Sequence, residues 1–281
     1  MRKHTTILVS ALLSATAVCL LLGVTRQTNA RLTDELGNLL IELQNNVPTS
    51  RAEAFYRLLQ LGSERDIRGH TNEIPYALAR LYGKNPERSD EIKMALIRLL
   101  ERENNFVHAQ KQEYKQSGQT LSEAYVDYYG DLIASVSSLK DQRALKGLMG
   151  AIGTGNMATK GLARLGSTSV YEVVGKLNDA DPITRLAAAR VLLQMLEPEN
   201  ARNIRDAAAR EQIKQGLLAA VNDTDPSLRL TGVEGLGALG DRSVIPILEK
   251  LALSDRFEGF GEEHPYPVRD AAKKALDRLR Q

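Results

Sequence analysis

One stretch of the sequence has the composition of a phosphate-binding loop. Residues 147–161, GLMGAIGTGNMATKG, combine glycines with a lysine that could meet a phosphate. A phosphate loop requires glycine, four residues and then Gly-Lys-Ser/Thr after a strand, whereas here the order is Thr159-Lys160-Gly161 between helical segments. The stretch therefore predicts a turn between two packed helices and no nucleotide cofactor.

The histidines and carboxylates are the second set of residues with chemical potential. Glu262, Glu263 and His264 are adjacent, and two carboxylates with an imidazole could hold a metal ion. Neither His70 nor His108 is paired at helical spacing with another ligand type on an evident helix face, and nothing nearby completes the first cluster. The GxSxG motif of serine hydrolases is absent from the sequence. We therefore expect no metal, no cofactor and no catalytic residue.

Three tyrosines at helical spacing are candidate binding residues. Tyr125 and Tyr129 are four residues apart and share a helix face, with Tyr128 beside them. Tyrosine combines a large apolar ring with a polar tip and is frequent in contact surfaces. The alternative is that the rings pack the junction between two blocks of repeats, because aromatic residues at this spacing often face a core.

A second aromatic group lies in a long connection near the C-terminus. Residues 255–267, DRFEGFGEEHPYP, carry Phe257, Phe260 and Tyr266 among glycines and acids, and the connection is about twice the usual length. Such a loop can bind a partner. It can equally fold back to cover the last helix of an array. Both interpretations remain open, and the three aromatic residues are candidate binding residues.

These candidates lie within copies of one short phrase. DPITR at 181–185 returns as DPSLR at 225–229 and as YPVR at 266–269. The arginines of these copies and of three weaker ones are separated by 37, 55, 42, 44 and 40 residues: Arg51, Arg88, Arg143, Arg185, Arg229 and Arg269. Repetition near 40 residues indicates a stacked array of helix pairs.

The chemistry of the phrase is that of a helix start. Asp181 and Asp225 are good caps, because a carboxylate accepts from the free amides of the first turn. Pro182 and Pro226 then occupy the first helical position, where no backbone donor is lost. A second phrase, LGxxxV, alternates with the first and begins the partner helix of each pair.

The pattern resembles the HEAT-repeat family, in the short form described with the phycobilin-lyase-like repeats. The resemblance rests on DPITRLAAARVLLQML, LGDRSVIPILEKLALSD and YPVRDAAKKAL, and it is strongest over residues 140–281. It implies an all-α, right-handed solenoid of about five or six helix pairs. It also implies that Arg185, Arg229 and Arg269 form a structural ladder to acidic or backbone groups of adjacent repeats. The last copy has Tyr266 in place of the capping aspartate, so we expect its cap to differ.

The interval of 55 residues implies an insertion of about 15 residues between Glu103 and Lys140. Both of its flanks have helical character. Thr120 is placed to cap the second helix, with Glu123 as its capping-box partner. We divide the chain into residues 1–30, degenerate helical repeats at 31–139 and regular repeats at 140–281.

Residues 1–30 have the features of an export signal. Positively charged residues precede an uncharged run from 7 to 24, and Thr28-Asn29-Ala30 offers small residues at a cleavage site. The run also reaches the minimum length of a membrane span, so an uncleaved anchor is the alternative. A lipid-modified Cys19 is less consistent with the apolar residues that follow it. We expect an exported protein, periplasmic or secreted, with membrane contact only through an uncleaved anchor.

Charge excludes one class of partner. The formal charge is +2, and residues 1–30 carry three basic and no acidic groups, which leaves 34 basic and 35 acidic residues in 31–281. This balance gives no electrostatic footprint for nucleic acid. The sequence favours a non-enzymatic protein-interaction module, an adaptor or scaffold in the cell envelope. The alternatives are an enzyme or chromophore-handling protein of the lyase type and a structural envelope component.

Overall fold

In the computed structural model, the described residues are 35–117, 120–259 and 265–281, and their regular structure is entirely helical. Residues 35–42 form the first helical segment. The α-helices that follow are α2 (Pro48–Gln60), α3 (Ile74–Lys84), α4 (Ser89–Ser117), α5 (Glu123–Ser138), α6 (Leu145–Gly150), α7 (Asn156–Leu165), α8 (Ser167–Gly175), α9 (Pro182–Met195), α10 (Pro198–Ala201), α11 (Ala207–Ala220), α12 (Pro226–Leu239), α13 (Ile245–Ser254) and α14 (Pro267–Arg280). Short 3-10 turns lie between them, at Thr71–Glu73, Pro86–Arg88, Gln142–Ala144, Lys176–Asn178 and Arg242–Val244.

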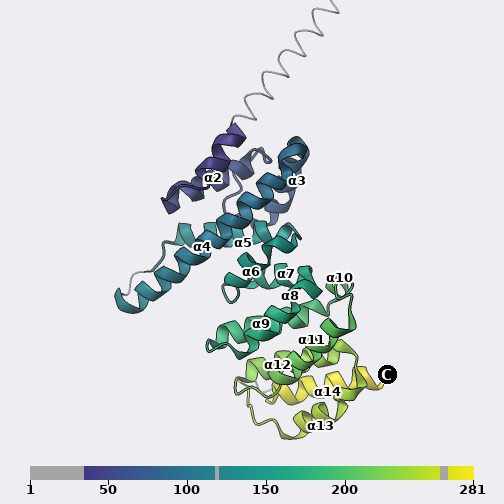
Figure 1. The fold of residues 1–281 in the computed structure, drawn as a ribbon. Helices are drawn as coiled ribbons and strands as arrows, with labels where there is room; N and C mark the ends of the chain where they lie inside the picture. The colour runs from purple at the N-terminus through teal and green to yellow at the C-terminus, as the bar shows by residue number, and fades with distance from the viewer. Residues whose placement is uncertain (1–34, 118–119, 260–264) are drawn as a thin grey trace, which may run out of the picture.

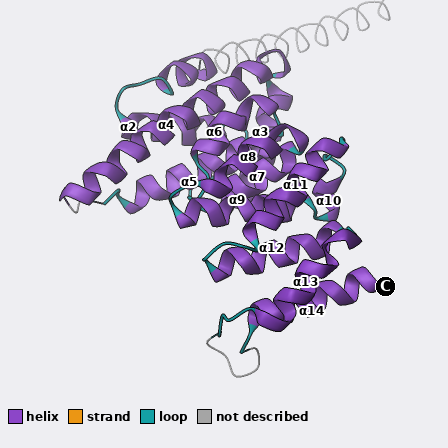
Figure 2. Cartoon of the chain, turned by 60° about the horizontal axis from the view of Figure 1, so that its bottom comes forward, coloured by secondary structure: helices purple, strands orange, loops and turns teal. Residues whose placement is uncertain are grey.

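The helices stack in two rows, and the chain runs from one end of the stack to the other (Figure 1). In one row α5, α7, α9, α12 and α14 contact one another in that order; in the other, α4, α6, α8 and α11 do so. Members of the two rows pair as α4 with α5, α6 with α7, α8 with α9 and α11 with α12. With α2–α3 and α13–α14, the described residues form six pairs, which confirms the predicted all-α solenoid. Figure 2 shows helices throughout, joined by short loops.

Small residues and leucines account for the close stacking. The core is lined mainly by leucine, alanine, valine and isoleucine from both rows. A Cβ added to Gly235 of α12 would lie 2.4 Å from a methyl carbon of Leu217 in α11, so only glycine permits this approach. Burying these apolar faces against each other stabilises helices that would be marginal alone.

The predicted capping aspartates and first-position prolines of the regular repeats are confirmed. Asp181 accepts hydrogen bonds from the amides of Ile183 and Thr184, and Asp225 accepts from that of Ser227. Pro182 and Pro226 are the first residues of their helices, as predicted. LGxxxV begins α8 and the turn before α13, so the two phrases alternate as expected.

The insertion lengthens α4 to 29 residues, and the far end of this helix projects beyond the stack before α5 returns to it (Figure 1). The predicted cap at Thr120 is wrong. α5 begins at Glu123, and the Ser122 side chain accepts from the amide of Tyr125. Threonine and serine can both cap a helix, so the capping preference by itself does not decide between the two positions.

Candidate functional site: a basic hollow among four segments

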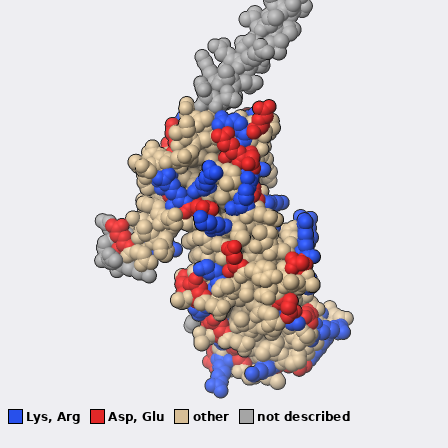
Figure 3. Space-filling view, in the orientation of Figure 1, with Lys and Arg blue, Asp and Glu red and all other residues tan. Residues whose placement is uncertain are grey.

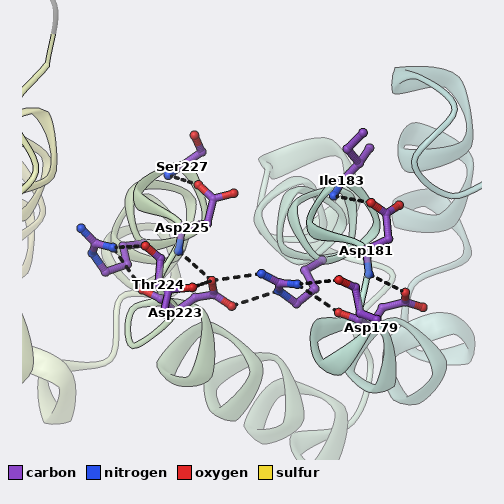
Figure 4. A network of polar contacts seen from close by, with 10 residues as sticks. Asp179, Asp181, Ile183, Asp223, Thr224, Asp225 and Ser227 are labelled. Atoms are coloured by element: carbon purple, nitrogen blue, oxygen red, sulfur yellow. Dashed lines mark hydrogen bonds and ion pairs between the residues drawn. The ribbon is translucent and has the colours of Figure 1, made fainter.

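The repeated arginines form a ladder between neighbouring repeats. Arg185 donates to both carboxylate oxygens of Asp223, at 3.1 and 3.4 Å, and to the carbonyl oxygens of Asp179 and Ala180. Asp223 also accepts from the amide of Asp225, so one carboxylate joins two repeats and fixes a helix start. Figure 4 shows Asp179 and Asp223 beside the capping aspartates of their own repeats.

The ladder continues to the end of the stack. Arg229 donates to Asp255 and to the carbonyls of Asp223 and Thr224, with the geometry of Arg185 one repeat later. Arg269 donates to the carbonyl of Asp255. The arginine ladder implied by the HEAT resemblance is therefore present. It is partly buried between repeats, and its arginines are engaged in bonds that stabilise the stack.

The first copy of the phrase has the same geometry with a different carboxylate. Arg51 donates to the carbonyls of Asn45 and Asn46, six and five residues earlier, and to both oxygens of Glu103 in α4. The side chains of Arg51 and Glu103 are 3% and 0% exposed. This ion pair joins α2 to α4 in the interior, where one charge without the other would be costly.

The three candidate tyrosines close over this pair, which corrects their assignment as a contact surface. Tyr125, Tyr128 and Tyr129 are all buried in the core. The hydroxyls of Tyr125 and Tyr128 donate to Glu103, and that of Tyr129 donates to Asn104. Because a carboxylate inside the protein receives these hydroxyls, the polar tips point inward, as in the packing alternative.

Burial keeps these tyrosines protonated. Burial raises the pKa of Tyr125 and of Tyr128, and the Glu103 carboxylate raises both further. Burial also raises the pKa of the nearby Asp131, which accepts from the hydroxyls of Tyr56 and Thr71. The tyrosine hydroxyls act as hydrogen-bond donors and hold the junction of α2, α4 and α5 together.

The C-terminal loop is only partly within the described residues, which exclude Phe260 and the Glu262-Glu263-His264 cluster. Phe257 is partly buried and packs against the core. Tyr266 precedes α14 without a side-chain cap, as its replacement of aspartate predicted, and its ring lies 4.1 Å from the Arg269 guanidinium carbon. Phe257 thus packs on the stack, as the covering interpretation expects, and the Tyr266 ring lies against Arg269 of its own helix. The binding role of the loop stays a prediction.

A hollow of about 630 Å³ opens on one edge of the stack. Its walls come from four segments that are distant in the sequence: the start of α3, the α5–α6 connection, the α7–α8 turn and the α10–α11 connection. In Figures 1 and 2, α3 and α10 lie on the same side of the stack. The residues that line it are Pro75, Ser138, Lys140, Gln142, Arg164, Leu165, Ser167, Thr168, Glu199, Asn200, Arg202, Asn203 and Arg205.

The hollow is strongly basic. Lys140, Arg164, Arg202 and Arg205 line it against the single carboxylate of Glu199, and all four cations are exposed. Among the described residues, none of the four has an ion-pair partner. Elsewhere charges are mixed, and the face in Figure 3 shows acidic and basic groups interspersed. The hollow therefore carries a local excess of positive charge that no ion pair within the described residues neutralises.

Neighbouring acids do not neutralise this excess, because each is already engaged. Asp141 adjoins Lys140 in the sequence and pairs with Arg143 at 2.7 Å. Asp206 adjoins Arg205 and caps α11, where it accepts from the amide of Ala209. Their carboxylates serve local structure.

Backbone geometry at the α7–α8 turn holds the hollow in shape. Gly166 has a positive φ of 61°, and a Cβ there would lie 2.4 Å from the carbonyl oxygen of Asn203. This close approach lets the Ser167 amide donate to that carbonyl, while the Ser167 hydroxyl accepts from the amide of Arg205. The turn that follows Arg164 of α7 and the connection that carries Arg205 are thus fastened together.

Lys140 has a conformation that is unusual for its residue type. It follows α5 with a positive φ of 52°, at a position where glycine commonly ends a helix. A side chain at positive φ costs about 1–2 kcal/mol. A strained lysine at the rim of a basic hollow is the kind of outlier that suggests a functional role.

An exposed aromatic residue lies beside the hollow. Tyr171 is 57% exposed, and it follows Ser167 and Thr168 by one turn of α8. It therefore shares their helix face. Tyrosine and arginine are both among the residue types enriched in protein interfaces.

Sequence reasoning did not find this site. Its cations are spread over residues 140–205 and belong to no motif, and the overall charge balance conceals them. One available signal was Arg202-Asn203-Ile204-Arg205, which places two arginines in a connection outside the repeated phrases.

Two further features of the described residues bear on other functions. No group of three His, Cys, Asp or Glu side chains there is placed to hold a metal ion. Within the same residues, no helix has the length and apolar character needed to cross a membrane. The predicted signal segment at 1–30 lies outside them, so its role stays a prediction.

Comparison with known proteins supports the repeat assignment. Residues 176–277 match the family model of HEAT repeats. A crystal structure of an engineered protein is similar to the chain with a TM-score of 0.43 and 16% sequence identity, over 87% of this chain and 96% of that one. No curated protein matches the sequence. The C-terminal pairs are thus similar to HEAT repeats over residues 176–277, as the sequence motifs indicated.

Proposed function

We propose that this protein is a non-enzymatic interaction module that binds another protein through the basic hollow, as an adaptor or scaffold in the cell envelope. HEAT repeats are generally protein-interaction modules, and the match at 176–277 provides that starting point. The observation that carries the proposal is the hollow itself, with four exposed cations that lack a partner within the described residues. Arginine and tyrosine at a concave surface favour contact with a second chain.

The location in the envelope rests on different evidence. Residues 1–30 combine basic residues, an apolar run and a small-residue cleavage site. Cell fractionation with N-terminal sequencing tests this part: we expect the protein in the envelope fraction, with Arg31 as its first residue if the signal is cleaved. A cytosolic protein that retains residues 1–30 would refute export and would favour the enzyme or chromophore-handling alternative.

Site-specific photocrosslinking in cells tests the interaction. A photoreactive phenylalanine analogue is introduced at Tyr171 beside the hollow, at Gln142 inside it, and at Leu253 as a control. Leu253 is 80% exposed and lies on α13, away from the hollow. We expect one discrete protein adduct from the first two positions and none from the control.

Two results would count against the interaction role. No adduct at either hollow position would remove the hollow as a binding surface. The same adducts at all three positions would indicate nonspecific contact, as expected of an abundant structural component. In either case, turnover by the purified protein would instead support the enzyme alternative.

A further inference from the structure

We infer that the partner presents an acidic peptide segment, rich in aspartate or glutamate, to the basic hollow. This inference rests on the proposed interaction function and specifies the chemistry of the partner. Its first support is charge: Lys140, Arg164, Arg202 and Arg205 face one carboxylate, Glu199, in a confined space. Carboxylates from outside would complete ion pairs that the described residues leave open.

The dimensions of the hollow favour an extended segment over a folded surface. A volume of about 630 Å³ is within the range of a ligand pocket and holds a few side chains. Its walls come from α3, α7, α8 and the connections beside α6 and α10, so a chain crossing it meets cations from three different segments. An extended peptide can direct successive carboxylates toward these separated charges.

The start of α8 adds a second electrostatic contribution. Ser167 and Thr168 are its first residues, and both line the hollow. The amino end of a helix carries partial positive charge, which acts in the same direction as the four side-chain cations. The hydroxyl of Thr168 and the amide of Gln142 are polar groups in the lining that suit a peptide backbone.

Other anionic macromolecules fit less well. Nucleic acid requires cations that follow its backbone over a long path, whereas residues 31–281 carry a net charge of −1. An anionic membrane surface is favoured by apolar side chains that enter the lipid. Pro75 and Leu165 are the aliphatic residues of the lining, and Leu165 is buried. The acidic peptide remains the best match.

Fluorescence anisotropy with charge-reversal variants tests the inference. The probe is a short fluorescein-labelled peptide of alternating glutamate and serine, compared with the same peptide carrying glutamine. The variant Arg202→Glu/Arg205→Glu reverses two hollow charges. The control, Lys250→Glu/Arg256→Glu, makes the same charge change at two exposed residues outside the hollow.

We expect the glutamate peptide to bind more tightly than the glutamine peptide and more weakly as salt increases. The hollow variant should lose affinity by about tenfold or more, and the control should change by less than about twofold. Circular dichroism verifies that both variants are folded, and Arg202→Gln/Arg205→Gln provides a milder change. Equal binding of the two peptides, or equal losses in the two charge-reversal variants, would overturn the inference.

Parallel binding measurements separate the other occupants. Phosphatidylglycerol vesicles, oligothymidylate and inorganic phosphate are offered to the same variants. If one of them binds tightly, is lost in the hollow variant and displaces the peptide, that ligand replaces the acidic segment. Adducts at Tyr171 in cells without binding of the acidic peptide would refute this inference and leave the interaction function standing. Peptide binding without any adduct would refute the function in cells.

Discussion

The buried pair of Arg51 and Glu103 should be one of the most sensitive points of the fold. Replacing Glu103 with glutamine preserves shape but removes the negative charge from a site that is 0% exposed. Arg51, whose side chain is 3% exposed, would keep its charge without a counterion. Removal of one partner of a buried pair costs about 3–5 kcal/mol. We expect Glu103→Gln to lower the free energy of unfolding by that amount.

A double-mutant cycle separates the charge from other effects. Arg51→Met alone leaves the Glu103 carboxylate buried without a partner and should also cost about 3–5 kcal/mol. The double variant Arg51→Met/Glu103→Gln contains no buried charge, and the glutamine oxygen still accepts from a tyrosine hydroxyl. It loses two arginine–carbonyl bonds of 3.0 Å, at about 1 kcal/mol each. The double variant should therefore be less damaged than the sum of the single variants by at least about 3 kcal/mol.

Urea denaturation followed by far-UV circular dichroism measures the overall change. Hydrogen exchange at the amides of α2, α4 and α5 localises it, because repeat arrays can open in segments. Glu91→Gln is the control, since Glu91 is 53% exposed in its pair with Arg88 and should cost less than about 1 kcal/mol. Additive single-variant effects, or a Glu103→Gln cost no larger than that of the control, would refute the role assigned to the buried pair.

Four further predictions concern other parts of the chain. Gly166→Ala should lower the free energy of unfolding by at least about 2 kcal/mol, because residue 166 has a positive φ and its new Cβ would lie 2.4 Å from the Asn203 carbonyl oxygen. Gly83→Ala in α3, where a Cβ would have nothing within 4 Å, should be neutral or stabilising. Thermal melting compares the two variants. Lys140→Gly should raise the free energy of unfolding by roughly 0.5–1 kcal/mol, because glycine adopts the positive φ of residue 140 without strain. The same change should weaken binding of the acidic peptide. A loss of stability would contradict the strain assigned to Lys140. Arg185→Lys should lower the free energy of unfolding by about 1–3 kcal/mol, because lysine cannot reproduce the four hydrogen bonds of the guanidinium. Arg190→Lys, at an exposed position of the same helix, is the control and should have little effect. The midpoint of urea denaturation compares the two variants. Burial alone would raise the pKa of Asp255, but the bonds from Arg229 and the Phe257 amide outweigh burial and lower that pKa. The stabilising contribution of Asp255 is therefore present above the ordinary aspartate pKa of about 3.9 and is lost as pH falls through the lower pKa of the folded state. Asp255→Asn should weaken the loss of stability at acidic pH in pH-dependent melting, and an unchanged dependence would contradict the assignment.

Local physical rules explain what could be predicted from the sequence. Asp181, Pro182 and Arg185 lie within one helical turn, so capping, proline placement and the repeat period were readable without tertiary information. The same locality explains the error at Thr120. Two hydroxyl residues there can cap a helix, and the capping preference by itself does not decide between Thr120 and Ser122.

The roles of the aromatic residues depended on contacts that are distant in the sequence. Tyr125 and Tyr128 are buried because Glu103, 22 and 25 residues earlier, accepts their hydroxyls. Their spacing alone fits an exposed surface as well as a core. A tyrosine points inward when an interior acceptor meets its hydroxyl, and that acceptor is set by how helices pack.

The sequence by itself determined the helical repeats, their period and the aspartate caps of the regular copies, because each depends on residues close together or on repetition. The arginine ladder followed from the resemblance to HEAT repeats, since its partners lie 26 to 38 residues apart. Only the tertiary structure decided where charge accumulates without compensation. The hollow joins residues 75, 138–142, 164–168 and 199–205, and no short window of sequence contains more than two of its four cations. Electrostatic potential depends on distance in space, and stacking the repeats is what brings these cations together.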